Sequence, residues 1–202
     1  MMKNKHEQND QNMDEYLPQV RKLNIDEVID SLGVQKSSKG YRFDFFNRTI
    51  FYDHNDFVDL SGKKLLPAIK NVFCKYFLKG SQNQTKSSGK LVTFREFSGA
   101  GPLFSRFTEN TSKTIEQTFS KRLENLQKKC EVLYSMPVDE SSYDLSVRFK
   151  ALPKVPIIFQ FNDADEILPA SSTLLFHDDA ENYLDLKSLA TICTYLTGLL
   201  IQ

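Results

Sequence analysis

Residues 143–176 have the sequence YDLSVRFKALPKVPIIFQFNDADEILPASSTLLF, which carries the strongest structural signal in the chain. In Tyr143–Ala151 apolar and polar side chains alternate, the period of two that is typical of a half-buried strand. Val155–Phe161 is almost continuously apolar and predicts a second, more deeply buried strand. Pro156 cannot donate a ladder hydrogen bond, so we expect it at the start of that strand or on an open side. The chain then turns through an acidic corner and returns apolar at Leu174–Phe176.

Outside this stretch, turn residues and apolar spacing predict further helices and hairpins. Asn24 and Gly33 are typical of a helix N-cap and of the residue that ends a helix, which predicts a short helix over Ile25–Leu32. The same kinds of signal predict the other elements, which are a hairpin over Gly40–Asp53, a helix from about Leu65 to Gly80, a strand over Lys90–Phe97, a helix from about Ser112 to Lys129, a short strand over Cys130–Tyr134 and a C-terminal helix over Asp185–Ile201.

These elements predict a single α+β domain, because the strands cluster in hairpins instead of alternating strictly with helices. We expect an antiparallel or mixed sheet of hairpins, packed against three to four helices that include a buried C-terminal helix. The domain is expected to span residues 14–202. Residues 1–13 are polar and are expected to be a disordered tail, and the polar segment 81–89 is expected to be a flexible loop.

The composition argues against several functions. Lys plus Arg and Asp plus Glu both number 26, so no overall field attracts nucleic acid, and no nucleic-acid partner is expected. The three cysteines are widely spaced without a CxxC pair, which argues against a zinc site, an iron–sulfur cluster and a disulfide framework. Met1–Asn12 is too polar for a signal peptide, and Ser188–Ile201 is too short to span a bilayer. We expect a cytoplasmic protein that does not bind membranes.

The acidic corner is one candidate for chemistry. Asp163, Asp165 and Glu166 follow the buried strand, and His177 and Asp178 follow the apolar return. If the two apolar segments pair, their ends could bring carboxylates and an imidazole together around a divalent metal, the one cofactor that the sequence suggests. The alternative is structural, because aspartates also occupy turns and caps by accepting hydrogen bonds from nearby amides. We favour the structural interpretation.

A second candidate is the small-residue turn that contains Ser98, Gly99 and Gly101. Its backbone amides could bind an anion, with Arg106 adding positive charge, and these four residues are the weak candidates for cofactor binding. The segment lacks the Gly-Lys-Ser/Thr of a phosphate-binding P-loop and the GxGxxG of a dinucleotide site. A tight turn explains the glycines at least as well.

No catalytic set is evident. Nucleophilic catalysis needs a base beside a serine or cysteine, and the only histidines are His6, His54 and His177. Cys74 and Cys193 lie on helix faces that look like core, where a free cysteine packs as a small hydrophobe. Cys130 has charged neighbours that could lower its pKa. His54 lies in an expected loop and could serve as its base, but nothing in the sequence supports such a dyad. The sequence therefore favours a protein that is not an enzyme.

The C-terminal helix is apolar over most of its circumference and carries one small, polar strip. The strip consists of Lys187, Thr191, Thr194 and Gly198, at positions i, i+4, i+7 and i+11. Small residues permit close approach by another element, either from the same fold or from a second subunit. We favour the intramolecular version, because most helices of a single domain pack internally.

Three segments carry a resemblance to a known family. They are TFREFSGAGPLFSRF (residues 93–107), LPKVPIIFQFNDADEILPA (152–170) and LLFHDDAENYLDL (174–186). From about Asp26 to the C-terminus, the chain resembles the prokaryotic domain-of-unknown-function family 3786. The resemblance implies a single α+β domain from an anaerobic bacterium or archaeon. Some relatives carry a cysteine-rich, iron–sulfur-type segment upstream, which these 202 residues do not contain. The family implies no established activity and no catalytic residues.

Two classes of function stay open. The first is a non-catalytic binding or accessory domain for a protein partner or a small ligand. It is based on the aromatic core, the missing catalytic set and the resemblance. The second is a metal-dependent enzyme that uses the acidic cluster around Asp165 and His177. A concave pocket lined by both acidic segments would favour the enzyme, whereas carboxylates that cap backbone amides would favour the binding domain.

Overall fold

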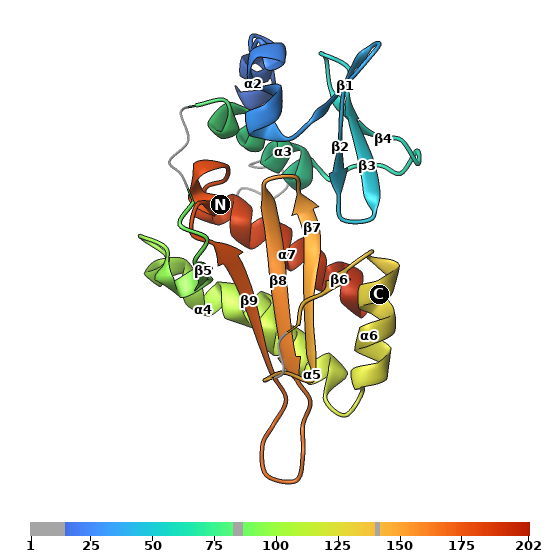
Figure 1. Cartoon of the computed structure of the whole chain (residues 1–202), viewed down its shortest axis with the longest axis vertical. Coiled ribbons are helices and arrows are strands. Elements are labelled where there is room, and N and C mark those ends of the chain that lie inside the picture. The colour runs from blue at the N-terminus through green and yellow to red at the C-terminus, as the bar shows by residue number, and fades with distance from the viewer. Residues whose placement is uncertain (1–14, 83–86, 140–141) are drawn as a thin grey trace, which may run out of the picture.

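The computed structural model describes residues 15–82, 87–139 and 142–202, and it contains two antiparallel sheets, one above the other along the long axis (Figure 1). The smaller sheet is a meander in the order β1-β2-β3-β4, with strands β1 Gln35–Ser37, β2 Gly40–Phe45, β3 Arg48–Tyr52 and β4 Phe57–Asp59. The larger sheet has the order β5-β9-β8-β7-β6, with strands β5 Leu91–Thr93, β6 Met136–Pro137, β7 Leu145–Leu152, β8 Val155–Asn162 and β9 Ser171–His177. The α+β prediction is confirmed.

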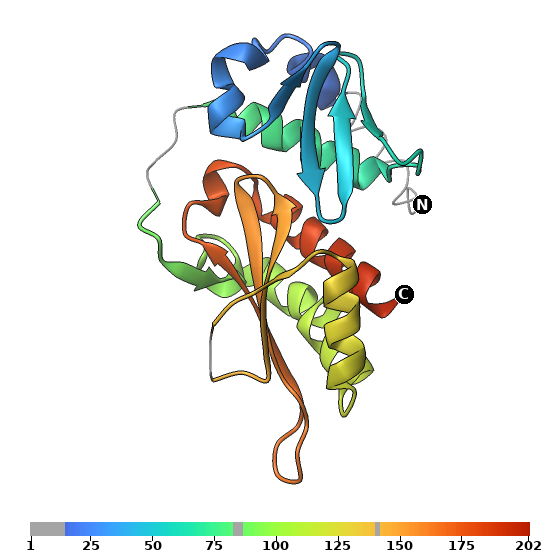
Figure 2. The same cartoon turned by 45° about the vertical axis from the view of Figure 1, so that its right-hand side comes forward.

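The helices divide between the two sheets (Figures 1 and 2). Helices α2 (Ile25–Leu32) and α3 (Pro67–Gly80) accompany the smaller sheet. Those that accompany the larger sheet are α4 Gly101–Asn110, α5 Ser112–Phe119, α6 Leu123–Val132 and α7 Leu186–Ile201. Residues 15–20 are also helical.

The central strands follow the predicted burial patterns. In β7, Phe149 is fully buried between exposed Arg148 and Lys150, whereas β8 is buried from Val155 to Phe161. β8 is the middle strand of the sheet, and its side chains are buried on both faces, as its continuous apolar run predicts. Pro156 is the second residue of β8, as its missing N–H predicts.

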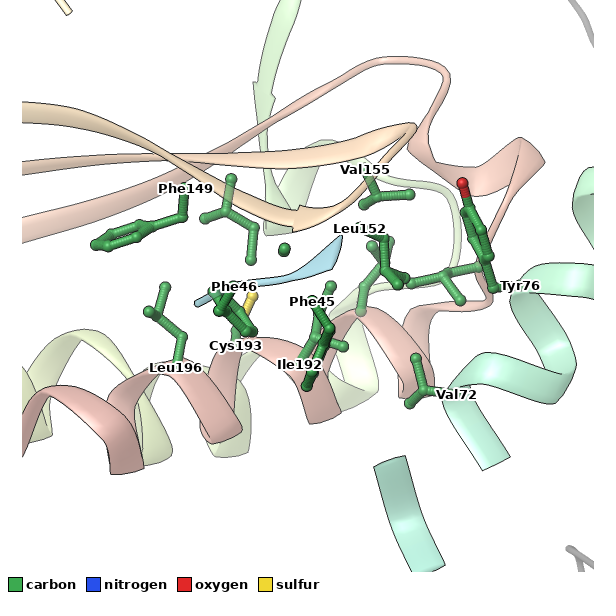
Figure 3. Close-up of a cluster of buried hydrophobic side chains, with 14 of the residues drawn as sticks. Phe45, Phe46, Val72, Tyr76, Phe149, Leu152, Val155, Ile192, Cys193 and Leu196 are labelled. Atoms are coloured by element: carbon green, nitrogen blue, oxygen red, sulfur yellow. The ribbon is translucent and has the colours of Figure 1, made fainter. Parts of the chain in front are cut away.

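The C-terminal helix α7 begins at a side-chain cap and runs through the middle of the molecule. The Asp185 carboxylate accepts a hydrogen bond from the Ser188 amide at 2.7 Å, which satisfies one of the free N–H groups of the first turn. Ile192, Cys193 and Leu196 are fully buried between α7 and the larger sheet (Figure 3). The predicted buried helix is confirmed.

Phe45 and Phe46, at the tip of the β2–β3 hairpin, join the two sheets. They insert between α7 and the larger sheet, near Phe149 (Figure 3). There the Phe45 ring stacks on Tyr195, and the Phe46 ring contacts Phe149. The backbone also connects the sheets, because the Phe46 amide donates to the Lys150 carbonyl oxygen at 2.8 Å. The register of β7 shifts between Phe149 and Leu152, next to this contact. One continuous apolar core therefore serves both sheets.

Three local predictions are wrong. Lys90–Phe97 is not one strand, because β5 ends at Thr93 and a 3-10 helix follows over Phe94–Glu96. The helix expected from about Ser112 to Lys129 is broken into α5 and α6 at Lys121, which has a φ of 58°. The strand expected over Cys130–Tyr134 is the end of α6 and the turn after it. The predicted tail, residues 1–13, and positions 83–86 of the predicted loop lie outside the described residues.

Candidate functional site

Asp163 and Asp165 of the acidic corner accept hydrogen bonds from backbone amides at the end of the β8–β9 hairpin. The Asp163 carboxylate accepts from the amides of Lys121 at 2.5 Å and Leu123 at 3.3 Å, and it therefore caps the first turn of α6. Asp165 accepts from the amides of Ile167 at 2.7 Å and Leu168 at 2.6 Å. These bonds lower the pKa of Asp165 below its ordinary value, because they stabilise the charged form. These contacts match the structural interpretation.

His177 and Asp178 lie at the other end of β9. β8 and β9 are antiparallel, with Asn162 opposite Ser171, so the acidic corner is at the start of β9 and His177 is at its end. At about 3.3 Å per residue, Ser171 and His177 are roughly 20 Å apart. Asp178 accepts hydrogen bonds from the hydroxyls of Ser87 and Ser88 instead.

The expected metal site therefore does not form among the described residues. The candidates for that site were Asp163, Asp165, Glu166, His177 and Asp178, and the antiparallel strands place them at two ends of the sheet. Within residues 15–82, 87–139 and 142–202, no group of three or more His, Cys, Asp or Glu side chains is arranged to hold a metal ion. The enzyme alternative needed Asp165 and His177 in one cluster, and the fold separates them.

The cysteines are unsuited to nucleophilic chemistry. Cys74, Cys130 and Cys193 are free and buried. Burial raises the pKa of Cys74 and of Cys130 to about 12, and it also raises the pKa of Cys193, because a thiolate is poorly solvated in an apolar core. The charged sequence neighbours of Cys130 do not lower its pKa.

The small-residue turn leads into a helix. Ser98, Gly99 and Gly101 precede or begin α4, and Gly99 has a φ of 77°, a left-handed conformation that favours glycine. Arg106 is one turn and a half further along α4. Ser98 and Gly99 do not line the cavity to which Arg106 belongs.

That cavity is an open groove between α4 and α7, and we call it the α4–α7 groove. Its volume is about 620 Å³, within the range of roughly 300–1,000 Å³ that is typical of ligand pockets. One wall is the face of α4 that carries Leu103, Arg106, Phe107 and Asn110, and the start of α3 closes one side with Leu66, Ala68 and Ile69. The floor comes from α7 and includes the predicted strip, Lys187, Thr191, Thr194 and Gly198.

The groove is mainly apolar and has positive charge on it. Arg106 and Lys187 line it together with Gln202, and no Asp or Glu side chain does among the described residues. Neither cation forms an ion pair with any part of the chain that the structure describes. The apolar side chain of Leu66 lines the groove, and Leu66 is 56% exposed to solvent. The groove suits a ligand or a partner segment that is apolar and carries negative charge.

The strip on α7 is open. α4 passes beside it, but a side chain added at Gly198 would meet no atom within 4 Å. The favoured expectation, in which another element of the same fold packs closely on the strip, is therefore not what the described residues show. The strip is the floor of a groove instead.

A network of polar side chains fixes the position of the groove floor. Arg48 donates from Nε to the Asp59 carboxylate at 2.5 Å and from Nη1 to the Tyr195 hydroxyl at 2.7 Å. Tyr195 also lines the groove. This network connects the groove to β3 and β4 of the smaller sheet, so the groove is built by both halves of the molecule.

A second cavity of about 400 Å³ lies between the two sheets. Arg42, Arg148 and Lys150 line it with Asp44, so it is more polar than the α4–α7 groove. Arg42 already donates to the Gln35 side chain at 2.9 Å. This cavity is the weaker candidate, because its more polar lining offers less apolar surface for a partner to cover.

The sequence identifies only part of the groove. The sequence shows the strip on α7 as small and polar residues along one side of an otherwise apolar helix. It also marks Arg106, but as a part of the candidate anion site at the small-residue turn. Leu66, Leu103 and Phe107 are missed, because apolar residues give no signal in the sequence that separates groove wall from core. Only the placement of α4 and α3 against α7 exposes them.

Comparison with protein families gives a match over most of the chain. The model of a family described as "Domain of unknown function (DUF3786)" matches residues 24–198. No curated protein matches the chain, and no solved structure matches it. Within the described residues, no helix combines the length and the apolar character that crossing a membrane requires.

Proposed function

The chain belongs to the DUF3786 family of domains of unknown function, and we propose that it is a non-catalytic binding domain whose partner occupies the α4–α7 groove. The observation that supports this proposal is an open, mainly apolar groove with two cations on it, Arg106 and Lys187. The occupant would be an apolar segment or small molecule that carries at least one negative charge. The domain would act by holding that occupant and not by transforming it.

Binding in the groove would bury apolar surface and pair two cations with an anion. Apolar side chains such as Leu66 contact water in the free protein, and covering them is favourable in proportion to the area removed from water. Arg106 and Lys187 would pair with an anion at the edge of the groove, which adds specificity and speeds association more than it adds affinity. The Arg48–Tyr195 hydrogen bond preorganises the groove floor, so binding costs little conformational entropy there.

The proposal includes a cellular location and a role for the protein. The three cysteines are free and buried, which suits a reducing compartment such as the cytoplasm. A binding domain without chemistry of its own would serve as an accessory protein in a prokaryote. A protein partner is favoured over a small ligand, because the groove is open along one side.

An anionic apolar dye tests the proposed groove. 8-Anilinonaphthalene-1-sulfonate should bind the folded protein and gain fluorescence. Thr194→Glu, which adds bulk and a negative charge on the groove floor, should weaken dye binding by at least about tenfold, a change of about 1.4 kcal/mol. Arg106→Gln, which removes a cation and keeps a polar side chain, should weaken it less.

The matched control is Ser105→Glu. Ser105 is exposed on α4 and does not line the groove, so the same new side chain should leave dye binding unchanged. Melting temperatures of all variants show whether they fold. If Thr194→Glu folds and binds the dye as wild type does, the groove is not the binding site.

A further inference from the structure

The loop of the β8–β9 hairpin exposes two large apolar side chains. Ile167 is 88% exposed and Leu168 is 63% exposed. Single exposed leucines are common on protein surfaces, but these two are adjacent at the end of a projecting element. Figures 1 and 2 both show the loop as the far end of the molecule, beyond α5 and α6. We call residues 165–168 the hairpin tip.

The hairpin tip has a defined shape. Asp165 accepts from the amides of Ile167 and Leu168, and its own amide donates to the Leu168 carbonyl oxygen at 3.0 Å. Just before the tip, Asp163 anchors the hairpin to the start of α6. These bonds hold Ile167 and Leu168 outward, so little order is lost when the tip enters a partner.

The hairpin tip and the α4–α7 groove are complementary in chemistry. The tip presents two apolar side chains beside the carboxylates of Asp165 and Glu166, and residues 163–170 contain no cation. The groove presents an apolar surface beside Arg106 and Lys187. Opposite charges around an apolar contact favour the correct orientation and oppose mismatched partners.

The tip of one chain cannot occupy the groove of the same chain. The groove is formed at α4 and α7, whereas the tip projects from the far end of the antiparallel β8–β9 ladder (Figures 1 and 2). Bending the hairpin back would break the ladder from Asn162–Ser171 onward. A second copy of the chain can present its tip without any such cost.

We propose that the protein self-associates by inserting the hairpin tip of one copy into the α4–α7 groove of another. Ile167 and Leu168 enter the apolar part of the groove, and Glu166 and Asp165 face Arg106 and Lys187. This proposal rests on the proposed function, since it names the occupant of the same groove. The contact joins two different surfaces, so it closes into a dimer only if two copies exchange tips, and otherwise it builds longer assemblies.

Sedimentation velocity over a wide concentration range tests the proposal with the full chain. Wild type should show a mass that rises above that of one chain as concentration rises. Ile167→Asp should weaken association by at least about thirtyfold, the scale of an interface hot spot. Leu60→Asp is the matched control, because Leu60 is 60% exposed outside both surfaces and its replacement should change nothing.

A charge exchange shows which surfaces meet. Glu166→Arg and Arg106→Glu should each weaken self-association, because each places like charges together. Mixing the two variants should restore it, since the tip of the Glu166→Arg variant then meets an oppositely charged groove in the Arg106→Glu variant. Arg148→Glu, which reverses a charge in the second cavity, should leave association unchanged. A wild-type protein that is monomeric at all concentrations, or mixed variants that do not associate, would overturn the proposal.

Dye binding separates the two proposals. If wild type stays monomeric but binds 8-anilinonaphthalene-1-sulfonate in a manner that Thr194→Glu abolishes, self-association fails and the groove is still a binding site. If association is lost in Ile167→Asp and that variant binds the dye more strongly than wild type does at high concentration, both proposals are supported, because the tip and the dye then compete for one groove.

Discussion

At the scale of single residues, Asp59 is a charge on which the groove depends. Its side chain is fully buried, and it pairs with Arg48, whose side chain is 12% exposed. Burial alone would raise the pKa of Asp59, but hydrogen bonds from Ser61 and Arg48 outweigh it and hold the pKa below its ordinary value. The carboxylate therefore stabilises the folded state in its charged form, and through Arg48 it positions Tyr195 in the groove floor.

Replacing Asp59 with asparagine should destabilise the protein in a pH-dependent manner. At pH 7 the loss should be about 3 kcal/mol, because Arg48 is left largely buried without its carboxylate. The folded-state pKa lies below the unfolded value of about 3.9, so wild type has this contribution above that pH and loses it as the pH falls through the folded-state pKa. The difference between wild type and Asp59→Asn should therefore shrink below about pH 4.

Urea denaturation at several pH values, from neutral down to about pH 3, measures this difference. Glu131→Gln serves as the control, because Glu131 is an exposed carboxylate on α6 that should matter little at any pH. A gap between wild type and Asp59→Asn that is equally large at both ends of this range would show that the ionised carboxylate is not the stabilising form.

At the scale of elements, α7 contributes to both the core and the groove. Leu196 is fully buried in the core, whereas Thr194 and Gly198 face the open groove. This division follows from the helical period, which places residues two apart on different sides of the helix. One helix can therefore stabilise the fold with one face and bind a partner with another.

Leu196→Ala should lower the free energy of unfolding by about 2–5 kcal/mol, because it leaves a cavity among fully buried side chains. Ile201→Ala, in the last turn of the same helix, should cost about 0.5 kcal/mol or less, since Ile201 is 44% exposed. Thermal and urea unfolding measure both. Equal losses in the two variants would mean that α7 is not buried as the structure has it.

At the scale of the whole molecule, the two sheets should unfold together. Phe46 belongs to the hairpin of the smaller sheet but packs against Phe149 of the larger sheet (Figure 3). It also contacts Tyr195 of α7. A side chain shared in this way couples the stability of both halves. We therefore expect one cooperative unfolding transition for the domain.

Hydrogen exchange followed by mass spectrometry checks this coupling. Phe46→Ala should lower the protection of amides in β2 and β3 and in β7 and β8 by the same free energy, about 3–5 kcal/mol. Phe57→Ala is a useful comparison, since Phe57 packs only on rings of the smaller sheet and α3 among its described ring contacts. If Phe46→Ala loosens only the smaller sheet, the halves are independent.

Elements with local signals could be predicted from the sequence. The alternation in β7, the apolar run of β8, the Asp185 cap of α7 and the left-handed Gly33 after α2 are all encoded within a few residues. Each depends on side-chain periodicity or on a single backbone conformation, so neighbouring residues suffice to specify it. The same local rules support the turn-forming interpretation of Asp163 and Asp165.

Which segments meet depends on the tertiary structure. Asp165 and His177 lie only twelve positions apart in the chain, yet the antiparallel direction of β8 and β9 places them at opposite ends of a strand. The break at Lys121, the groove and the exposure of Ile167 likewise depend on how distant elements pack. Periodicity tells which face of an element is apolar, but an apolar face becomes core or binding surface only when the rest of the chain covers it or leaves it open.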